Sequence, residues 1–272
     1  MKIDTLYFKI SDFIIALTFH QENRPFLLSN IKNNIIKFYH EFLISDSERN
    51  ISKPNFTIEF HSAKYLKISY DGQKRFINYY DKKSKKKFIV YDHISIAQFQ
   101  FILLKLLLNL YEKKTVLLLH ASAVNIDNNA YIFIGRQSSG KSTIIKLLKN
   151  KYQALADDTV IIRKFSGRYY FYQTPFVEKE SWVIKSPKRY YLGKIFLIKK
   201  SKTSTVRKII DKNIIFQNIL NNVLPEWNHL LHNKQQIGNL LDFSINYPYF
   251  YELKFNKNQS CLTKLLNKSK LA

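Results

Sequence analysis

The most informative segment of this chain of 272 residues is Gly135-Arg136-Gln137-Ser138-Ser139-Gly140-Lys141-Ser142. It fits the pattern G-x-x-x-x-G-K-[ST], in which glycines let the backbone wrap around phosphate groups. The apolar run Ala130-Tyr131-Ile132-Phe133-Ile134 precedes it as a buried strand, and an amphipathic helix from Ser142 to Lys149 follows it. The free N–H groups at the start of such a helix point at bound phosphates. The sequence therefore predicts a nucleotide-binding loop between a strand and a helix.

Within this loop, Lys141 is expected to be exposed and to place its positive charge on the β- and γ-phosphates of ATP. The Ser142 hydroxyl is expected to be a ligand of Mg²⁺. The residues expected to bind the nucleotide are Gly135, Gln137, Ser138, Ser139, Gly140, Lys141, Ser142 and Thr143.

Two adjacent carboxylates, Asp157 and Asp158, follow the apolar residues Ala154-Leu155-Ala156 in a segment expected to be one strand as far as Ile162. In P-loop proteins a carboxylate at such a strand end meets the magnesium ion. Neighbouring side chains of an extended chain point to opposite sides, so the two acids are expected to do different work. One would organise the metal, and the other would accept a proton from a hydroxyl nucleophile. The alternative is an ordinary acidic surface turn.

His120 follows the apolar run Val116-Leu117-Leu118-Leu119, which is typical of a strand buried on both faces. A lone histidine in this position is more often structural than catalytic. Whether His120 is catalytic depends on the residues that the fold places beside it.

These three pieces together resemble the HPr kinase/phosphorylase superfamily, which is related to the ATP-dependent phosphoenolpyruvate carboxykinases. The likeness rests on the order of His120-Ala-Ser-Ala-Val124, the glycine loop and Ala156-Asp157-Asp158. It is nearest to the short stand-alone members of bacterial biosynthetic clusters, some of which phosphorylate a serine of a lasso-peptide precursor. The segments Thr174-Pro175-Phe176 and 193–198 also resemble the family, so the likeness covers about residues 115–200.

The resemblance implies that Asp157 is the general base and that Asp158 and His120 are its catalytic neighbours. It implies a magnesium site that includes Ser142, Asp158 and one of Glu178 and Glu180, whose spacing leaves the choice open. The chain departs from the family at Gln137 and Ser138, where Ser and Gly are usual. The signature that binds HPr and runs phosphorolysis is not recognisable, which argues against HPr as the substrate and against a phosphorylase role.

The expected fold class is α/β (α+β), with a P-loop core of the HPr-kinase and carboxykinase type and a mixed β-sheet. Residues 1–95 are expected to form a β-rich N-terminal region that binds the substrate, and residues 96–272 the kinase domain. The N-terminal region reads as short strands such as Leu6–Ile10 and Phe56–Phe60, with a hairpin around Asp71-Gly72. Ser95 is expected to cap a buried helix. Helices are also expected near residues 214–223 and 230–240.

The composition excludes several classes of protein. The single cysteine rules out an internal disulfide. The sequence contains no run of about 18 uncharged apolar residues, so no membrane-spanning helix is expected. No signal peptide is recognisable, so we expect a cytoplasmic protein. The net charge is +24, with 44 Lys+Arg against 20 Asp+Glu. The densest basic run, residues 82–87, reads as a turn that is either simply solvated or a docking surface for an acidic ligand.

The favoured function is an ATP- and Mg²⁺-dependent kinase that phosphorylates a hydroxyl, such as that of a serine, in a peptide or small molecule. An acidic acceptor would suit the basic surface, and a homo-oligomer is expected. The alternatives are a P-loop ATPase associated with nucleic acid and a module that senses ATP without turnover. No nucleic-acid-binding motif is recognisable, so nucleic acid is not the expected partner.

Overall fold

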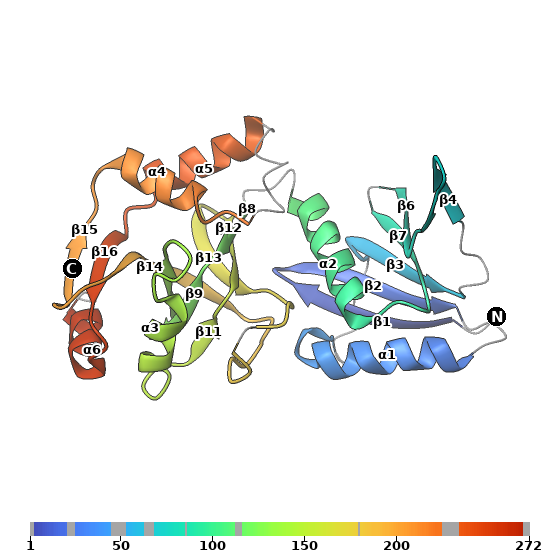
Figure 1. The fold of residues 1–272 in the computed structure, drawn as a ribbon, viewed down its shortest axis with the longest axis horizontal. Helices are drawn as coiled ribbons and strands as arrows, with labels where there is room; N and C mark the ends of the chain where they lie inside the picture. Colours follow the sequence, from blue (N-terminus) through green and yellow to red (C-terminus); the bar gives the residue numbers. More distant parts are fainter. Residues whose placement is uncertain are drawn as a thin grey trace. The chain divides into compact units, whose positions relative to one another are not determined.

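The computed structural model describes residues 3–20, 25–44, 53–62, 68–84, 86–111, 116–178, 180–224 and 234–268. The chain divides into two compact units, Met1–Leu110 and Tyr111–Ala272 (Figure 1). This boundary lies later than residue 95, because helix α2 (Ile96–Tyr111) belongs to the N-terminal unit. Its Phe99 ring packs against Phe8 and Phe60 of the N-terminal sheet, with ring centroids 6.5 and 5.9 Å away.

The N-terminal unit is built around a mixed sheet with the strand order β1-β2-β3-β7-β6. Strands β2, β3 and β7 run parallel, whereas β1 and β6 are antiparallel edges. The strands are β1 (Ile3–Ile10), β2 (Phe13–His20), β3 (Phe56–His61), β6 (Tyr80–Ser84) and β7 (Lys87–Tyr91), and β4 (Ile68–Asp71) and β5 (Lys74–Ile77) form the expected hairpin. The basic run is only in part the expected turn, because Lys82–Ser84 belong to β6 and Lys87 belongs to β7, with Lys86 in the turn between them. Lys85 and residues 63–67 before β4 lie outside the described residues.

One helix of this unit was not expected from the sequence. Helix α1 (Pro25–Tyr39) runs along the sheet in Figure 1 and continues into a 3-10 turn (His40–Phe42). Its buried residues Leu28, Ile31, Ile35 and Tyr39 recur every three or four positions, as an amphipathic helix requires. Asparagines between them weaken its intrinsic helix propensity, so its stability comes from tertiary packing.

The cap expected at Ser95 is confirmed. The Gln98 N–H donates to Ser95 Oγ at 3.2 Å, and the Ser95 N–H donates to Gln98 Oε1 at 2.9 Å. This reciprocal pair is a capping box, which satisfies two amide donors at the start of α2.

The C-terminal unit contains a second mixed sheet, with the order β11-β9-β10-β14-β13-β12-β8 and with β16 paired to both β14 and β15. Strands β10, β14 and β16 are parallel, so their carboxyl ends meet at one edge. The strands are β8 (Val116–His120), β9 (Ser122–Ile126), β10 (Asn129–Ile134), β11 (Ala154–Ala156), β12 (Thr159–Phe165), β13 (Arg168–Gln173), β14 (Arg189–Lys200), β15 (Thr205–Lys208) and β16 (Phe250–Phe255). A mixed α/β fold is therefore confirmed.

Helices α3 (Lys141–Leu148) and α6 (Gln259–Lys268) lie together against this sheet in Figure 1. Ile144, Ile145 and Leu148 of α3 share one core with Leu262 and Leu266 of α6 and with the side chains of β9, β10 and β16. This packing fixes the start of α3 at the carboxyl end of β10.

Helix α4 (Lys212–Leu220) confirms the first of the two later helices, and α5 (Lys234–Asn246) overlaps the second. Residues 225–233 between them lie outside the described residues. Within the described ranges, no helix is both long enough and apolar enough to cross a membrane.

Candidate active site

The glycine loop joins β10 to α3 through two residues with left-handed backbone conformations. Gly140 has a φ of 106°, and a Cβ atom there would lie 2.7 Å from the Phe255 ring, so only glycine fits. Ser138 has a φ of 61°, a left-handed conformation that glycine adopts at a lower steric cost than other residues. The Ile144 N–H is the first to bond back into the helix, at 3.0 Å from Gly140 O. The Ser139 N–H already donates to Arg136 O at 3.1 Å, whereas the amides of Lys141, Ser142 and Thr143 in the first turn of α3 can donate to an anion.

The expectation that Lys141 is exposed is wrong. Only 7% of this residue is accessible, and its Nζ donates to the carbonyl oxygens of Gly135 at 2.8 Å and Arg136 at 3.4 Å. Burial lowers the pKa of Lys141, and the negative charges of Asp158 and Asp157 oppose that shift. The loop carbonyls therefore hold the ammonium group in place before any ligand arrives.

The expectation of one continuous strand through Asp157 and Asp158 is also wrong. Strand β11 pairs with β9, whereas β12 pairs with β8 and β13, so the chain crosses between two places in the sheet. The two acids occupy the bend at this crossing. Because the backbone is not extended there, both carboxylates face the same cavity instead of opposite sides of a strand.

Asp157 is 3% exposed and is positioned by two hydrogen bonds. The Ser122 hydroxyl of β9 donates to its Oδ1 at 3.0 Å, and its own N–H donates to Glu178 Oε2 at 2.8 Å. Burial and the bond from Ser122 restrict the carboxylate, and the bond to Glu178 restricts the backbone of Asp157.

Asp158 pairs with His120, whose Nδ1 lies 3.0 Å from Asp158 Oδ1. The hydrogen bond from His120 lowers the pKa of Asp158; burial opposes the shift, and the Thr159 hydroxyl and the Lys141 charge add to it. The pairing of β8 with β12 sets Thr159 opposite His120, which brings the histidine to the acids.

These groups line one cavity of about 500 Å³. Its walls contain the acids, the histidine and most of the loop, in the set His120, Gln137, Ser138, Gly140, Lys141, Ser142, Thr143, Asp157, Asp158 and Lys200. Gly135 and Ser139 instead line a neighbouring cavity of about 700 Å³, together with Arg136, Ile198 and Arg207. Lys200, at the carboxyl end of β14, borders both cavities.

The two glutamates behave differently. The Glu178 side chain is 5% exposed, forms an ion pair with Lys185 and accepts the Asp157 N–H, so it supports the backbone of Asp157. Burial lowers the pKa of Lys185, against the charge of Glu178. Glu180 instead bonds Lys146 of α3 at 2.8 Å and the Trp182 indole N–H at 2.9 Å. In the described part of the chain neither glutamate lines the cavity, and Glu178 is the one connected to it.

Sequence reasoning missed Asn222, which lies just after α4. Its side-chain Oδ1 accepts the Gly135 N–H at 3.2 Å, and its backbone oxygen accepts the His120 N–H at 2.7 Å. Its Nδ2 donates to Asn218 O at 2.8 Å. Asn222 thus joins the start of the glycine loop to the strand of the candidate histidine, and no local sequence pattern signals this role.

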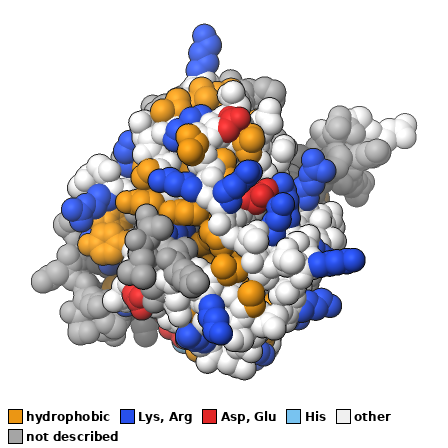
Figure 2. Space-filling model, turned by 90° about the vertical axis from the view of Figure 1, so that its left-hand side faces the viewer, with side chains coloured by type: hydrophobic (Ala, Val, Ile, Leu, Met, Phe, Trp, Pro, Cys, Tyr) orange, Lys and Arg blue, Asp and Glu red, His pale blue; other side chains and the backbone are white. Residues whose placement is uncertain are grey.

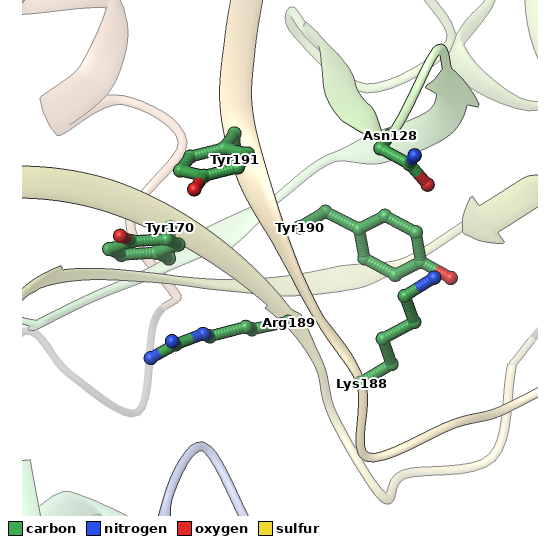
Figure 3. A pocket seen from close by; sticks show the side chains of 6 residues that line it. All are labelled: Asn128, Tyr170, Lys188, Arg189, Tyr190 and Tyr191. Atoms are coloured by element: carbon green, nitrogen blue, oxygen red, sulfur yellow. The ribbon is translucent and has the colours of Figure 1, made fainter.

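A further pocket of about 270 Å³ lies at the start of β14 (Figure 3). The Arg189 guanidinium carbon is 4.9 Å from the Tyr170 ring centroid, and Lys188 Nζ is 5.3 Å from that of Tyr190. Of the described residues that line this pocket, none is acidic. It therefore lacks the carboxylates that distinguish the cavity beside the glycine loop.

The surface around β15 and β16 is strongly basic. Figure 2 shows many Lys and Arg side chains on this face, few Asp and Glu side chains, and apolar side chains between them. Such a surface attracts anionic molecules and raises their association rates.

The sequence matches no family model and no curated protein. Among solved structures, the chain is similar to the Hpr(Ser) kinase/phosphatase from Coxiella burnetii, with 12% sequence identity and a TM-score of 0.32. The alignment covers 57% of this chain and 96% of that chain. This is a distant likeness of fold.

Proposed function

We propose that this protein is a phosphotransferase that moves the γ-phosphate of ATP to a hydroxyl group. The observation that carries the proposal is the single cavity shared by the glycine loop, Lys141, Asp157 and the Asp158–His120 pair. A phosphate-binding loop alone would suit any nucleotide-binding protein. A buried, positioned carboxylate beside it adds a proton acceptor, which transfer to a hydroxyl requires.

The glycine loop and the start of α3 would bind the phosphates. Lys141 is already desolvated and held by loop carbonyls, and its charge would stabilise the phosphates during transfer. Gln137, Ser138 and Thr143 line the same cavity and would complete the contacts. The neighbouring cavity with Arg136 and Ile198 would take the rest of the nucleotide.

The residues of the cavity fit Mg²⁺. Ser142 and Asp158 supply a hydroxyl and a carboxylate oxygen on its wall, and Mg²⁺ is typically held by one or two such groups together with substrate phosphates. When bound, the ion neutralises the charge of the phosphates. His120 would hold Asp158 in its ionised form through their hydrogen bond.

Asp157 would act as the general base. Its burial and the hydrogen bond from the Ser122 hydroxyl hold the carboxylate, and the bond from its backbone N–H to Glu178 holds the main chain beside the cavity. There it would take the proton of the acceptor hydroxyl while the oxygen attacks phosphorus. The acceptor would be a serine of a peptide or a small-molecule alcohol, and the basic surface favours an acidic one.

The test measures conversion of ATP to ADP by the purified full-length chain with Mg²⁺, with and without candidate peptides and alcohols. A phosphate mass shift on an added hydroxyl compound, lost in Asp157→Asn, is the expected result. ATP turnover that needs nucleic acid and no hydroxyl acceptor would instead identify a P-loop ATPase. Failure of the wild type to bind ATP would refute the site itself.

A further inference from the structure

A second cluster of chemically active side chains lies in the N-terminal unit, on strands β2 and β3. These strands are parallel neighbours, with Thr18 opposite Glu59 and Phe19 opposite Phe60. His20 ends β2, and Glu59 and His61 are two positions apart on β3, so their side chains share one face of the sheet. The two imidazole rings stack, with centroids 4.3 Å apart.

The donor atoms of this cluster are close enough to share one ion. His61 Nε2 lies 3.5 Å and His20 Nε2 lies 3.9 Å from Glu59 Oε2, and one donor atom from each residue falls within 4.8 Å of the others. A tetrahedral zinc site with bonds of about 2.0–2.1 Å separates its donors by roughly 3.3 Å. Small side-chain rotations would therefore close the cluster around a metal.

We propose that His20, Glu59 and His61 bind one divalent transition-metal ion such as Zn²⁺. Two imidazoles and a carboxylate form a donor set for such ions and not for Mg²⁺, which prefers oxygen ligands. The three side chains are 13%, 18% and 22% exposed, so the site is sheltered but open to a water molecule as the fourth ligand. It would be distinct from the Mg²⁺ site proposed in the other unit.

Lys87 limits the affinity of this site. Its Nζ lies 2.8 Å from Glu59 Oε1, whereas both histidines approach Oε2. The ammonium group therefore leaves the ligand oxygen in place but repels an incoming cation. Lys87 is 43% exposed at its side chain and can turn toward solvent, so its removal should strengthen metal binding.

The test is a titration of the untagged, chelator-treated full chain with Zn²⁺ against a chromogenic competitor, without nucleotide. We expect one equivalent to bind with a micromolar or lower dissociation constant. His20→Ala and His61→Ala should each weaken binding at least about tenfold, which is the usual minimum for loss of a ligand or its support. Lys87→Gln should tighten it.

Two matched variants control for other histidines. His40→Ala removes an exposed histidine of the same unit, and His120→Ala removes the one in the candidate active site; neither should change the stoichiometry or the affinity. Co²⁺ should give the visible absorption of a four- or five-coordinate ion in the wild type and lose it in His61→Ala. The proposal is overturned if the wild type binds Zn²⁺ only at millimolar concentrations, or if His120→Ala abolishes the binding.

These outcomes do not depend on the proposed kinase activity. A protein that binds one Zn²⁺ through His20 and His61 but transfers no phosphate would support this site and refute the other. Circular dichroism of each variant shows whether it loses Zn²⁺ binding because it is unfolded. If the variants are unfolded, the titration of the wild type alone tests whether the chain binds Zn²⁺.

Discussion

Replacing Asn222 with alanine should loosen the glycine loop, because this side chain accepts the Gly135 N–H across 87 residues of sequence. The change leaves that N–H without its acceptor, which costs about 1–3 kcal/mol if it stays buried. It also removes the bond from Nδ2 to Asn218 O, with a net value of about 0.5–1.5 kcal/mol. The expected loss of stability is therefore about 1.5–4.5 kcal/mol.

At about 2–4 °C per kcal/mol for a unit of this size, the melting temperature of the C-terminal unit should fall by roughly 3–18 °C. Without nucleotide, the loop can relax and recover part of the lost energy. Binding of the phosphates would require the loop to return to its ordered conformation. About 1.4 kcal/mol of the lost stability should therefore appear as a tenfold weaker affinity for ATP.

Thermal unfolding followed by circular dichroism, and calorimetric titration with a non-hydrolysable ATP analogue, measure the two effects. The matched control is Asn213→Ala, an exposed asparagine at the start of α4, which should change neither quantity. If Asn222→Ala melts within about 1 °C of the wild type and binds the analogue equally well, Asn222 does not order the loop.

Three further results are expected at the site. Lys141→Met should lower the phosphotransfer rate by about 10²–10³-fold, because the charge that stabilises the phosphates is lost. The melting temperature without ligand should stay nearly unchanged, because burial of the ammonium group already carries a desolvation cost. Full activity in this variant would contradict the proposed site. Asp157→Asn should lower the rate by about 10²–10⁴-fold with ATP binding intact, and an equal loss of binding would make Asp157 a metal ligand instead of the base. His120→Ala should raise the pKa of Asp158 toward its ordinary value in a carboxyl ¹³C NMR titration, and an unchanged titration would show that the pair does not form in solution. The pKa of Asp158 is lower in the folded chain than in the unfolded chain, where it is about 4. Ionised Asp158 therefore stabilises the fold above the unfolded pKa, and this stabilisation is lost as the pH falls through the folded pKa. The loss of stability in acid should be smaller in His120→Ala.

Features that depend only on residues close together in the chain were predictable from the sequence. The strand, glycine loop and helix around Lys141 follow from the spacing of glycines and apolar side chains, and the structure has them in that order. The Ser95 cap and the β6–β7 turn are local in the same sense. Such patterns are readable because their hydrogen bonds and steric limits act within a few residues.

Local sequence patterns gave the wrong prediction where tertiary packing outweighed the intrinsic secondary-structure preferences of the residues. The asparagine-rich helix α1 forms because its apolar face is buried, which a scan of intrinsic preferences does not reveal. The apolar residues around Asp157 and Asp158 predict one extended strand, but β11 and β12 pair with different neighbours, so the chain bends between them. Strand pairing is a property of the whole sheet, and it turned both carboxylates toward one cavity.

The side chains that meet at the two sites come together only in the folded chain. Lys141 is buried because the folded loop wraps its carbonyls around the ammonium group, and Glu178 instead of Glu180 reaches Asp157 because Lys146 and Trp182 hold Glu180 elsewhere. His20 and His61 meet because β2 lies beside β3. These contacts join residues far apart in the chain, often through backbone amides that every residue carries, so no spacing in the sequence distinguishes them.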